Sequence, residues 1–170
     1  TIRVAAQRIA YLLLCMKSPQ EYFSLPRDAS IHLLNIAYNA PQAHRAFFEP
    51  LAKRVRASSW FNDRAHAVQN QIQYDKNILA ISGHSNAESQ EGLNLLLGIA
   101  DEIDAFKSKN EKVGTGNQAR EASTSAESIL NMIESSAKSR FPRTYKRVAI
   151  SYPRYVGSPI QRLRMQAAKN

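Results

Sequence analysis

The sequence predicts an α/β fold in which a mostly parallel sheet is flanked by helices on both faces. Segments with apolar residues at helical spacing alternate along the chain with short apolar runs typical of strands. One of these runs, at 93–100, is almost entirely apolar, as in a parallel strand buried on both faces. At 170 residues the chain is long enough to bury one such domain, and no internal repeat divides it.

The first half of the chain predicts a helix, a strand, a second helix and a hairpin. The spacing of apolar residues predicts a helix over 2–16, and the run IHLLNIAY predicts a buried strand over 31–38. The second helix is expected to kink or restart at Pro50, because proline lacks the amide hydrogen that a helix uses. Alternating apolar residues predict a hairpin over 71–83 that turns at 75–77.

The second half continues the alternation of helices and strands. Its final helix is signalled by a serine followed by a proline, which is typical of a helix start. We expect, in order, a short helix, a strand, a polar surface loop, a helix, a strand and a last helix, at 87–91, 93–100, 107–124, 126–137, 147–151 and from Ser158-Pro159 onward.

The sharpest functional signal is a pair of acids directly after a predicted strand. Asp101 and Glu102 follow the apolar run of LLLGIADEID, and ligands of open α/β sheets bind at the carboxyl ends of the strands. In nucleotide hydrolysis the first such carboxylate holds Mg²⁺, usually through water, and the second accepts a proton from the attacking water. Asp101 is therefore a candidate metal ligand and Glu102 a candidate base. Two solvated acids at an ordinary strand end would give the same pattern.

Polar residues also follow two other predicted strands. Ser151 precedes Tyr152 and Pro153 and could contact a γ-phosphate, although a strand that simply ends at a proline has the same pattern. Asn39 and Gln42 could hydrogen-bond a nucleotide, and the alternative roles are a helix cap and an exposed helix residue.

Several kinds of site are missing from the sequence. It contains no Gly-x-x-x-x-Gly-Lys-Ser/Thr, and hence no backbone cradle for phosphates. The four histidines do not pair at metal-ligand spacing, which argues against zinc. Cys15 is the only cysteine, which excludes an internal disulfide, and its apolar neighbours predict a buried thiol. The apolar runs are too short to span a membrane.

The net charge of +9 is concentrated at one end of the chain. Residues 135–170 hold nine Lys or Arg and no acid, and the remaining residues sum to zero. Clustered positive charge attracts polyanions such as nucleic acid or nucleotide phosphates, and a solvated basic face is the alternative. The candidate DNA contacts in this stretch are Arg143, Lys146, Arg147, Arg162 and Arg164.

Three segments together resemble the ATPase half of the large terminase subunit of tailed bacteriophages. The segment IAYNAPQAHRAFF resembles the family's second strand and following helix. The segment ISGHSNAESQEGLNLLLGIADEIDAF resembles its hairpin, glycine turn and Walker B strand. The segment SSAKSRFPRTYKRVAISYPRYVGSPI resembles the helix, strand and coupling segment that come next. The resemblance rests on the order and spacing of these pieces over nearly the whole chain.

The resemblance implies a P-loop NTPase-like fold of the ASCE class. It also implies hydrolysis of ATP with Mg²⁺, which in the family drives double-stranded DNA into a viral procapsid. By position, it gives Asp101 and Glu102 the Walker B roles. Ser151, Tyr152 and Pro153 take the position that couples hydrolysis to DNA movement.

The same resemblance implies that residues 1–170 are a single, partial motor domain. In the family the Walker A loop directly precedes a helix like the one over 2–16, so we expect the loop and its strand to lie before Thr1 and Thr1 to be a candidate nucleotide contact. The family's nuclease domain is not expected within this chain. Ring motors use an arginine in trans to stabilise the developing charge, and Arg140 and Arg154 are the candidates.

The partners implied by the resemblance are double-stranded DNA, the portal protein and the small terminase subunit. A homo-oligomeric ring, not associated with a membrane, would act in the cytoplasm of a bacterial host as a viral or prophage-encoded protein. A helicase or another P-loop ATPase is the alternative with the same fold. A non-catalytic basic DNA-binding module is the alternative from another class. By itself the chain is expected to be inactive, because it lacks Walker A.

Overall fold

A six-stranded sheet forms the centre of the computed structural model, which describes residues 2–84, 92–106 and 125–168. The strand order is β2-β3-β4-β1-β5-β6. β1 pairs in parallel with β4 and β5, and β5 with β6, whereas β3 pairs antiparallel with β2 and β4. The predicted α/β fold is confirmed. The strands are β1 (Ile31–Ala37), β2 (Ala65–Val68), β3 (Gln71–Tyr74), β4 (Ile78–His84), β5 (Leu95–Asp101) and β6 (Lys146–Ile150).

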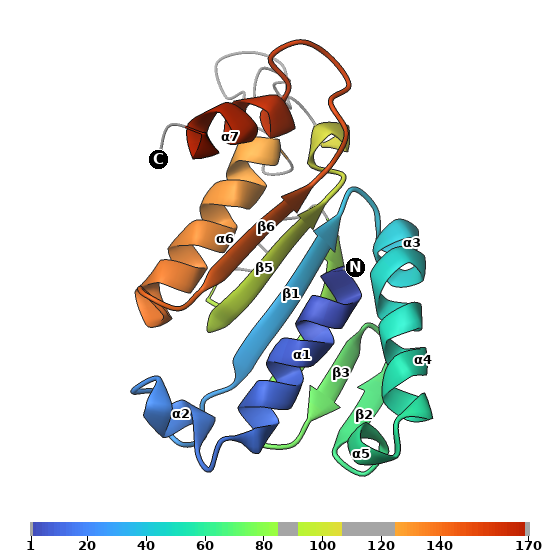
Figure 1. The fold of residues 1–170 in the computed structure, drawn as a ribbon, viewed down its shortest axis with the longest axis vertical. Helices are drawn as coiled ribbons and strands as arrows, with labels where there is room; N and C mark the ends of the chain where they lie inside the picture. The colour runs from blue at the N-terminus through green and yellow to red at the C-terminus, as the bar shows by residue number, and fades with distance from the viewer. Residues whose placement is uncertain (1, 85–91, 107–124, 169–170) are drawn as a thin grey trace, which may run out of the picture.

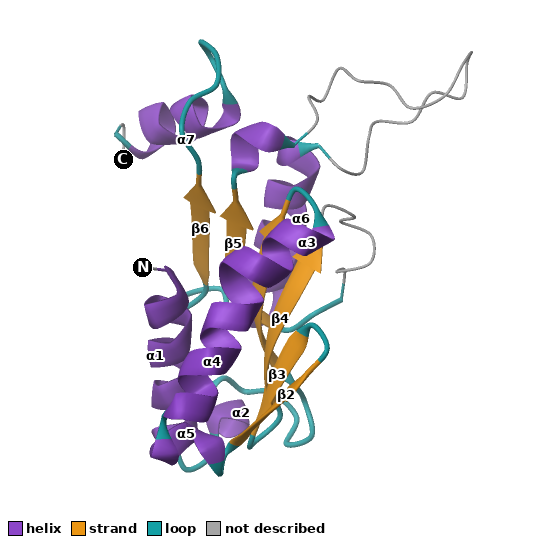
Figure 2. Cartoon of the chain, turned by 90° about the vertical axis from the view of Figure 1, so that its right-hand side faces the viewer, coloured by secondary structure: helices purple, strands orange, loops and turns teal. Residues whose placement is uncertain are grey.

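Helices cover both faces of this sheet (Figure 1; Figure 2). One hydrophobic core lies under α1 and α4, and a second lies under α6. The predicted helix over 87–91, the predicted loop over 107–124 and Thr1 lie outside the described residues. The described helices are α1 (Ile2–Cys15), α2 (Pro19–Tyr22), α3 (Ala40–Ala43), the π-helix η1 (His44–Phe48), α4 (Glu49–Ala57), α5 (Ser59–Asn62), the 3-10 helix η3 (Ile103–Ala105), α6 (Ala126–Arg140) and α7 (Pro159–Ala167).

The kink predicted at Pro50 takes the form of a π-helical turn. The backbone N–H of Glu49 donates to the carbonyl of His44, five residues earlier. Pro50 has no N–H to donate, and its ring would clash with the carbonyl four residues before it in a regular helix. The wider turn of η1 avoids that clash, and α3, η1 and α4 follow one another as a continuous path (Figure 2).

Gly98 allows α6 to lie directly on β5. A Cβ built at this glycine would come 2.3 Å from Cγ2 of Ile133, which is closer than two non-bonded carbon atoms can approach. Ile133 is fully buried in the core between α6 and the sheet. The glycine therefore fixes how closely α6 approaches the strand that carries the acid pair.

One prediction about burial is wrong. Cys15 is exposed, not buried, because it ends α1 on the side of the helix away from the sheet. The strand predicted over 147–151 forms as β6. It is the last strand of the sheet, and its residues Lys146, Arg147 and Ile150 are exposed. An edge strand keeps one row of backbone groups unpaired.

An apolar groove of about 210 Å³ runs beside β6 on the side of α1. Residues in or next to α1, α2 and β5 form its walls, together with Lys146 at the start of β6 and Thr144 just before it. The lining residues are Ile9, Leu12, Leu13, Met16, Tyr22, Phe23, Leu96, Thr144 and Lys146. The described part of the chain thus has both an open strand edge and uncovered apolar surface at the same place.

Candidate nucleotide site at the carboxyl edge of the sheet

Asp101 lies at the carboxyl edge of the sheet, next to the start of α1. It is the last residue of β5 and pairs with Ile150 of β6. Because side chains alternate along a strand, Asp101 is on the same face as Leu97 and Ile99, which belong to the core under α1. The charge of Arg3, in the first turn of α1, acts on the Asp101 carboxylate. The start of α1 is therefore within electrostatic range of the acid.

The pKa of Asp101 is raised above its ordinary value of 3.8. Burial of the carboxylate is the largest cause, and the negative charge of neighbouring Glu102 raises the pKa further. A hydrogen bond with the Glu102 backbone and the positive charge of Arg3 act in the opposite direction. A partly buried carboxylate beside a second acid is a site where a bound cation relieves unfavourable charge.

Glu102 has a left-handed backbone conformation at the point where β5 ends. Its φ and ψ are 54° and 49°, a conformation that costs a non-glycine residue on the order of 1–2 kcal/mol. Its carboxylate lies 3.6 Å from the guanidinium of Arg154, and both side chains are 41% exposed. Arg154 in turn lies over the ring of Tyr152, 5.8 Å from the ring centre. Backbone strain of this kind is concentrated at functional sites.

Ser151 is bound to the turn that follows the two acids. Its hydroxyl accepts a hydrogen bond from the N–H of Asp104 at 3.3 Å and donates to the carbonyl of Tyr152 at 3.3 Å. By the alternation of side chains along β6, Ser151 lies on the α6 face, opposite to Asp101. Tyr152 and Pro153 are exposed. A contact of Ser151 with a γ-phosphate stays a prediction.

Asn39 is the N-cap of α3. Its side-chain oxygen accepts a hydrogen bond from the N–H of Gln42 at 2.9 Å. Both residues line a shallow hollow of about 430 Å³ together with Pro41, Arg45 and Ala46, beyond the carboxyl end of β1. The capping alternative describes the observed role of Asn39, and nucleotide contacts by the two residues stay predictions.

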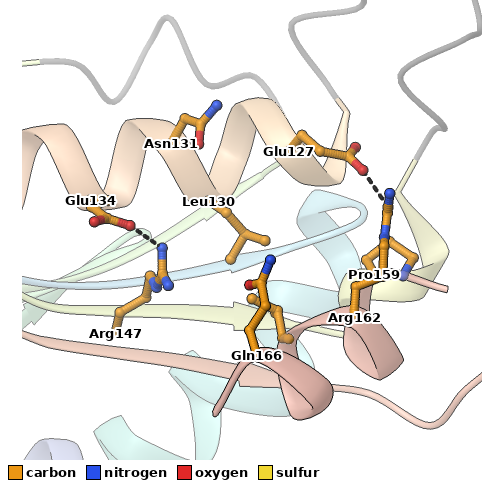
Figure 3. Close-up of a pocket in the computed structure, with 9 residues that line it drawn as sticks. Glu127, Leu130, Asn131, Glu134, Arg147, Pro159, Arg162 and Gln166 are labelled. Carbon is orange, nitrogen blue, oxygen red and sulfur yellow. Dashed lines mark hydrogen bonds and ion pairs between the residues drawn. The ribbon is translucent and has the colours of Figure 1, made fainter. Parts of the chain in front are cut away.

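Two of the predicted DNA contacts are paired with acids on α6 (Figure 3). Arg147 of β6 forms an ion pair with Glu134, and Arg162 of α7 forms one with Glu127. Lys138 pairs with Glu134 from the next turn of α6. The Arg147–Glu134 and Arg162–Glu127 pairs line a groove of about 350 Å³ between α6, β6 and α7. Much of the local positive charge is neutralised there.

The other basic candidates are exposed at different ends of the molecule. Arg140 ends α6 and Arg143 follows it, so both precede β6 and lie at the edge of the sheet opposite to Asp101 (Figure 1). Lys146 begins β6, and Arg164 is on α7. Of the two arginine-finger candidates, Arg154 alone lies beside the acid pair of its own chain.

Asp104 has contacts that the sequence analysis did not anticipate. It is only 6% exposed and is bound to two segments that follow β6. The signal in the sequence was a third acid, two residues after Glu102, in an otherwise apolar stretch. Its partners, Ser151 and Ile160, lie about fifty residues further along the chain, which sequence spacing does not reveal.

Asn35 is a second residue with no assigned role. It is fully buried in β1, on the α1 face, and pairs across the sheet with Ser82 of β4. Neither polar atom of the Asn35 side chain, nor the Ser82 hydroxyl, has a hydrogen-bond partner in the described part of the chain. The sequence signal was a polar residue in the middle of the apolar run IHLLNIAY.

The residues at this edge fit a magnesium–nucleotide site in part. Mg²⁺ in such sites is held by one or two carboxylates together with phosphate oxygens and water, and Asp101 beside Glu102 supplies such carboxylates. No group of three or more potential metal ligands occurs among the described residues. The phosphate cradle has no counterpart in the printed sequence.

In the ranges described, no helix is both long enough and apolar enough to cross a membrane.

Comparisons with known proteins bear on this arrangement. The family model described as "Uncharacterized protein MJ0330, N-terminal P-loop domain" matches residues 1–169. The crystal structure of the HK97 bacteriophage large terminase is similar, with a TM-score of 0.59 and 15% sequence identity. The similarity covers 97% of this chain and 30% of the terminase chain, and at this identity it shows a shared fold alone. No curated protein matches the chain significantly.

Proposed function

Because the chain belongs to the family of the MJ0330 N-terminal P-loop domain, we propose that it is the main part of an ATPase domain whose hydrolysis moves double-stranded DNA. The observation that carries the proposal is the acid pair. Asp101 lies at the carboxyl edge of a parallel sheet beside the start of α1, and Glu102 follows it directly. P-loop ATPases hydrolyse nucleotide at such an edge.

In the proposed mechanism the two acids have different tasks. The partly buried Asp101 carboxylate would hold Mg²⁺. Mg²⁺ held there would supply positive charge that offsets the negative charge of the phosphate oxygens. Glu102 accepts a proton from the attacking water. The guanidinium of Arg154 lies 3.6 Å from Glu102 and places positive charge beside the proposed base.

The phosphate cradle, in this proposal, comes from a strand and a glycine-rich loop that precede Thr1 in the natural protein. Two features support this arrangement. The outer edge of β6 has no partner strand in the described ranges, and an apolar groove lies uncovered beside it. The first turn of α1 begins close to Asp101, so a loop entering α1 would present its backbone N–H groups there.

DNA movement is proposed from the distribution of charge. Residues 135–170 hold nine basic residues and no acid, and Arg143 and Arg164 are exposed. Hydrolysis and DNA would be linked through 151–153, as the terminase resemblance implies. The portal protein, the small terminase subunit and a homo-oligomeric ring are further parts of the proposal. An arginine from the neighbouring subunit, with Arg140 or Arg154 as candidates, would complete each site.

The test is magnesium-dependent ATP turnover by the full-length natural protein that contains this chain, with Glu102 replaced by Gln. Loss of a general base reduces turnover by about 10²–10⁴-fold. Glu21→Gln is the matched control, because Glu21 is an exposed acid of α2, paired with Arg27, at the far end of the sheet. Its turnover should equal that of the wild type.

Three outcomes separate the alternatives. Full turnover in Glu102→Gln would remove Glu102 as the base. Absence of any turnover in the wild type, with retained DNA binding, would favour the non-catalytic basic module. Turnover accompanied by strand separation of duplex DNA, instead of movement along an intact duplex, would favour a helicase.

A further inference from the structure

Asp104 connects the turn after the acid pair to the segment that follows β6. Its backbone N–H donates to the Ser151 hydroxyl at 3.3 Å. Its side-chain Oδ1 accepts a hydrogen bond from the N–H of Ile160 at 2.9 Å. Asp104 is 6% exposed, so both bonds are largely shielded from water. One residue thus fixes the turn that carries Glu102 against two points of a distant segment.

The bond to Ile160 caps α7 from outside the helix. Ser158 occupies the N-cap position of α7, but its side chain makes no capping hydrogen bond and its buried hydroxyl has no partner in the described ranges. The first N–H groups of a helix need acceptors, and a carboxylate there also interacts favourably with the helix dipole. Asp104 supplies that acceptor although it lies 56 residues earlier in the chain.

Glu102 depends on the residues that follow it for its position. Its left-handed conformation is unfavourable by itself. The turn is held because Ile103 and Phe106 are buried in the core under α6 and because Asp104 is bound on both sides. The carbonyl of Glu102 accepts the N–H of Ala105, which closes η3. The side chain of Glu102 then projects toward Arg154 and is 41% exposed.

We propose that Asp104 is a positioning residue, which holds Glu102 at the reacting water and fastens α7 to the same turn. The inference rests on the proposed function, because it gives Glu102 the role of base. The carboxylate acts as a hydrogen-bond acceptor for Ile160 and does not touch the nucleotide. A change in the turn at 101–104 is therefore transmitted to the first turn of α7.

The experiment compares Asp104→Ala and Asp104→Asn in the full-length natural protein, with Ser158→Ala as the matched control at the same helix start. Asn keeps an oxygen that can accept from Ile160, whereas Ala removes it. Ser158→Ala removes a buried hydroxyl that makes no capping bond. Circular dichroism establishes that each variant is folded, and Asp104→Ser, whose oxygen is one bond shorter, replaces Asp104→Ala if that variant does not fold.

Two readouts are measured: hydrogen exchange at the Ile160 amide, and kcat and KM for ATP. In Asp104→Ala we expect exchange to accelerate about tenfold or more, kcat to fall about 10- to 100-fold, and KM to change less than about threefold. Asp104→Asn and Ser158→Ala should stay within about threefold of the wild type in both readouts. A purely structural role for Asp104 would lower stability without this separation of kcat from KM.

Each other result overturns a defined part of the reasoning. Unchanged exchange at Ile160 in Asp104→Ala overturns the capping bond, whatever the activity. Faster exchange with unchanged kcat overturns the positioning of Glu102. Equal losses in Asp104→Asn and Asp104→Ala overturn the acceptor role. A wild type without turnover removes the proposed function and the positioning role together, and the exchange data then decide the contact with α7 separately.

Discussion

Replacement of Gly98 by Ala tests how α6 packs on the strand that carries the acids. The added methyl would stand 2.3 Å from Cγ2 of Ile133 and 3.2 Å from its Cγ1. Carbon atoms that are not bonded prefer separations of roughly 3.5–4.0 Å. Relief of the clash therefore requires a shift of more than about 1 Å by Ile133 or by α6 as a whole.

The expected loss of stability in Gly98→Ala follows from how tightly the new methyl group would be packed against Ile133. Insertion of a methyl group into a well-packed core costs about 1–3 kcal/mol. With a urea m-value of roughly 2 kcal/mol per molar, the unfolding midpoint should fall by about 0.5–1.5 M. Ile133 is fully buried, so its truncation to Ala should cost about 2–5 kcal/mol.

The double variant Gly98→Ala/Ile133→Ala separates crowding from other causes. Truncation of Ile133 removes the two atoms nearest to the new methyl, Cγ2 and Cγ1, and leaves Cβ at 3.3 Å. The combined loss should be smaller than the sum of the single losses by about 1–3 kcal/mol, measured by urea unfolding of the chain. Ile129→Ala is the matched control, because Ile129 is also fully buried on α6, one turn earlier. Its effect should add to that of Gly98→Ala within about 0.5 kcal/mol. Additive losses for Gly98 and Ile133 would refute the predicted contact.

Two further predictions concern charge. Asp101→Asn should raise the thermal midpoint at pH 7 without Mg²⁺, because the pKa of Asp101 is raised in the folded chain and its ionised form destabilises the fold. The gain should shrink as the pH falls through the folded-state pKa and vanish below 3.8, so a gain that does not change with pH in calorimetry would argue against a buried carboxylate. Arg143→Ala and Arg164→Ala should each reduce the salt slope of duplex DNA binding by about 1, measured by fluorescence anisotropy. Arg147→Ala and Arg162→Ala should reduce it less, because Glu134 and Glu127 already neutralise those charges, and equal reductions by all four variants would contradict this assignment.

The sequence predicts elements whose apolar residues repeat clearly and misses those that depend on distant contacts. The helix over 126–137 forms as α6 with its predicted apolar residues buried. β2 (Ala65–Val68) was not predicted, because it is only four residues long and contains no buried residue: three are half-buried and His66 is exposed. Its strand conformation depends on pairing with β3. The exposure of β6 likewise depends on which strands surround it, and no local pattern records that.

The distribution of charge along the sequence likewise does not show which charges are paired in the fold. A count along the chain finds no acid in residues 135–170 and suggests a uniformly basic segment. In the fold, two acids of α6 that precede this segment form ion pairs with arginines inside it. Glu127 pairs with Arg162, and Glu134 pairs with Arg147. The left-handed backbone of Glu102 is also invisible to sequence analysis, because a glutamate predicts no such conformation and the anchors that impose it lie elsewhere.

DNA binding by Lys146 and pairing of a preceding strand with β6 would both use the outer edge of β6. Its position at the start of β6 makes it a candidate DNA contact, yet it also lines the apolar groove beside α1. A preceding strand that pairs with β6 would cover this groove, and Lys146 would then lie next to that strand. Arg143 precedes β6 and Arg164 is on α7, so both stay outside the covered edge. If the phosphate loop enters along β6, DNA is therefore contacted from the ends of β6 and not along its length, and Lys146→Ala should change the salt slope less than Arg143→Ala.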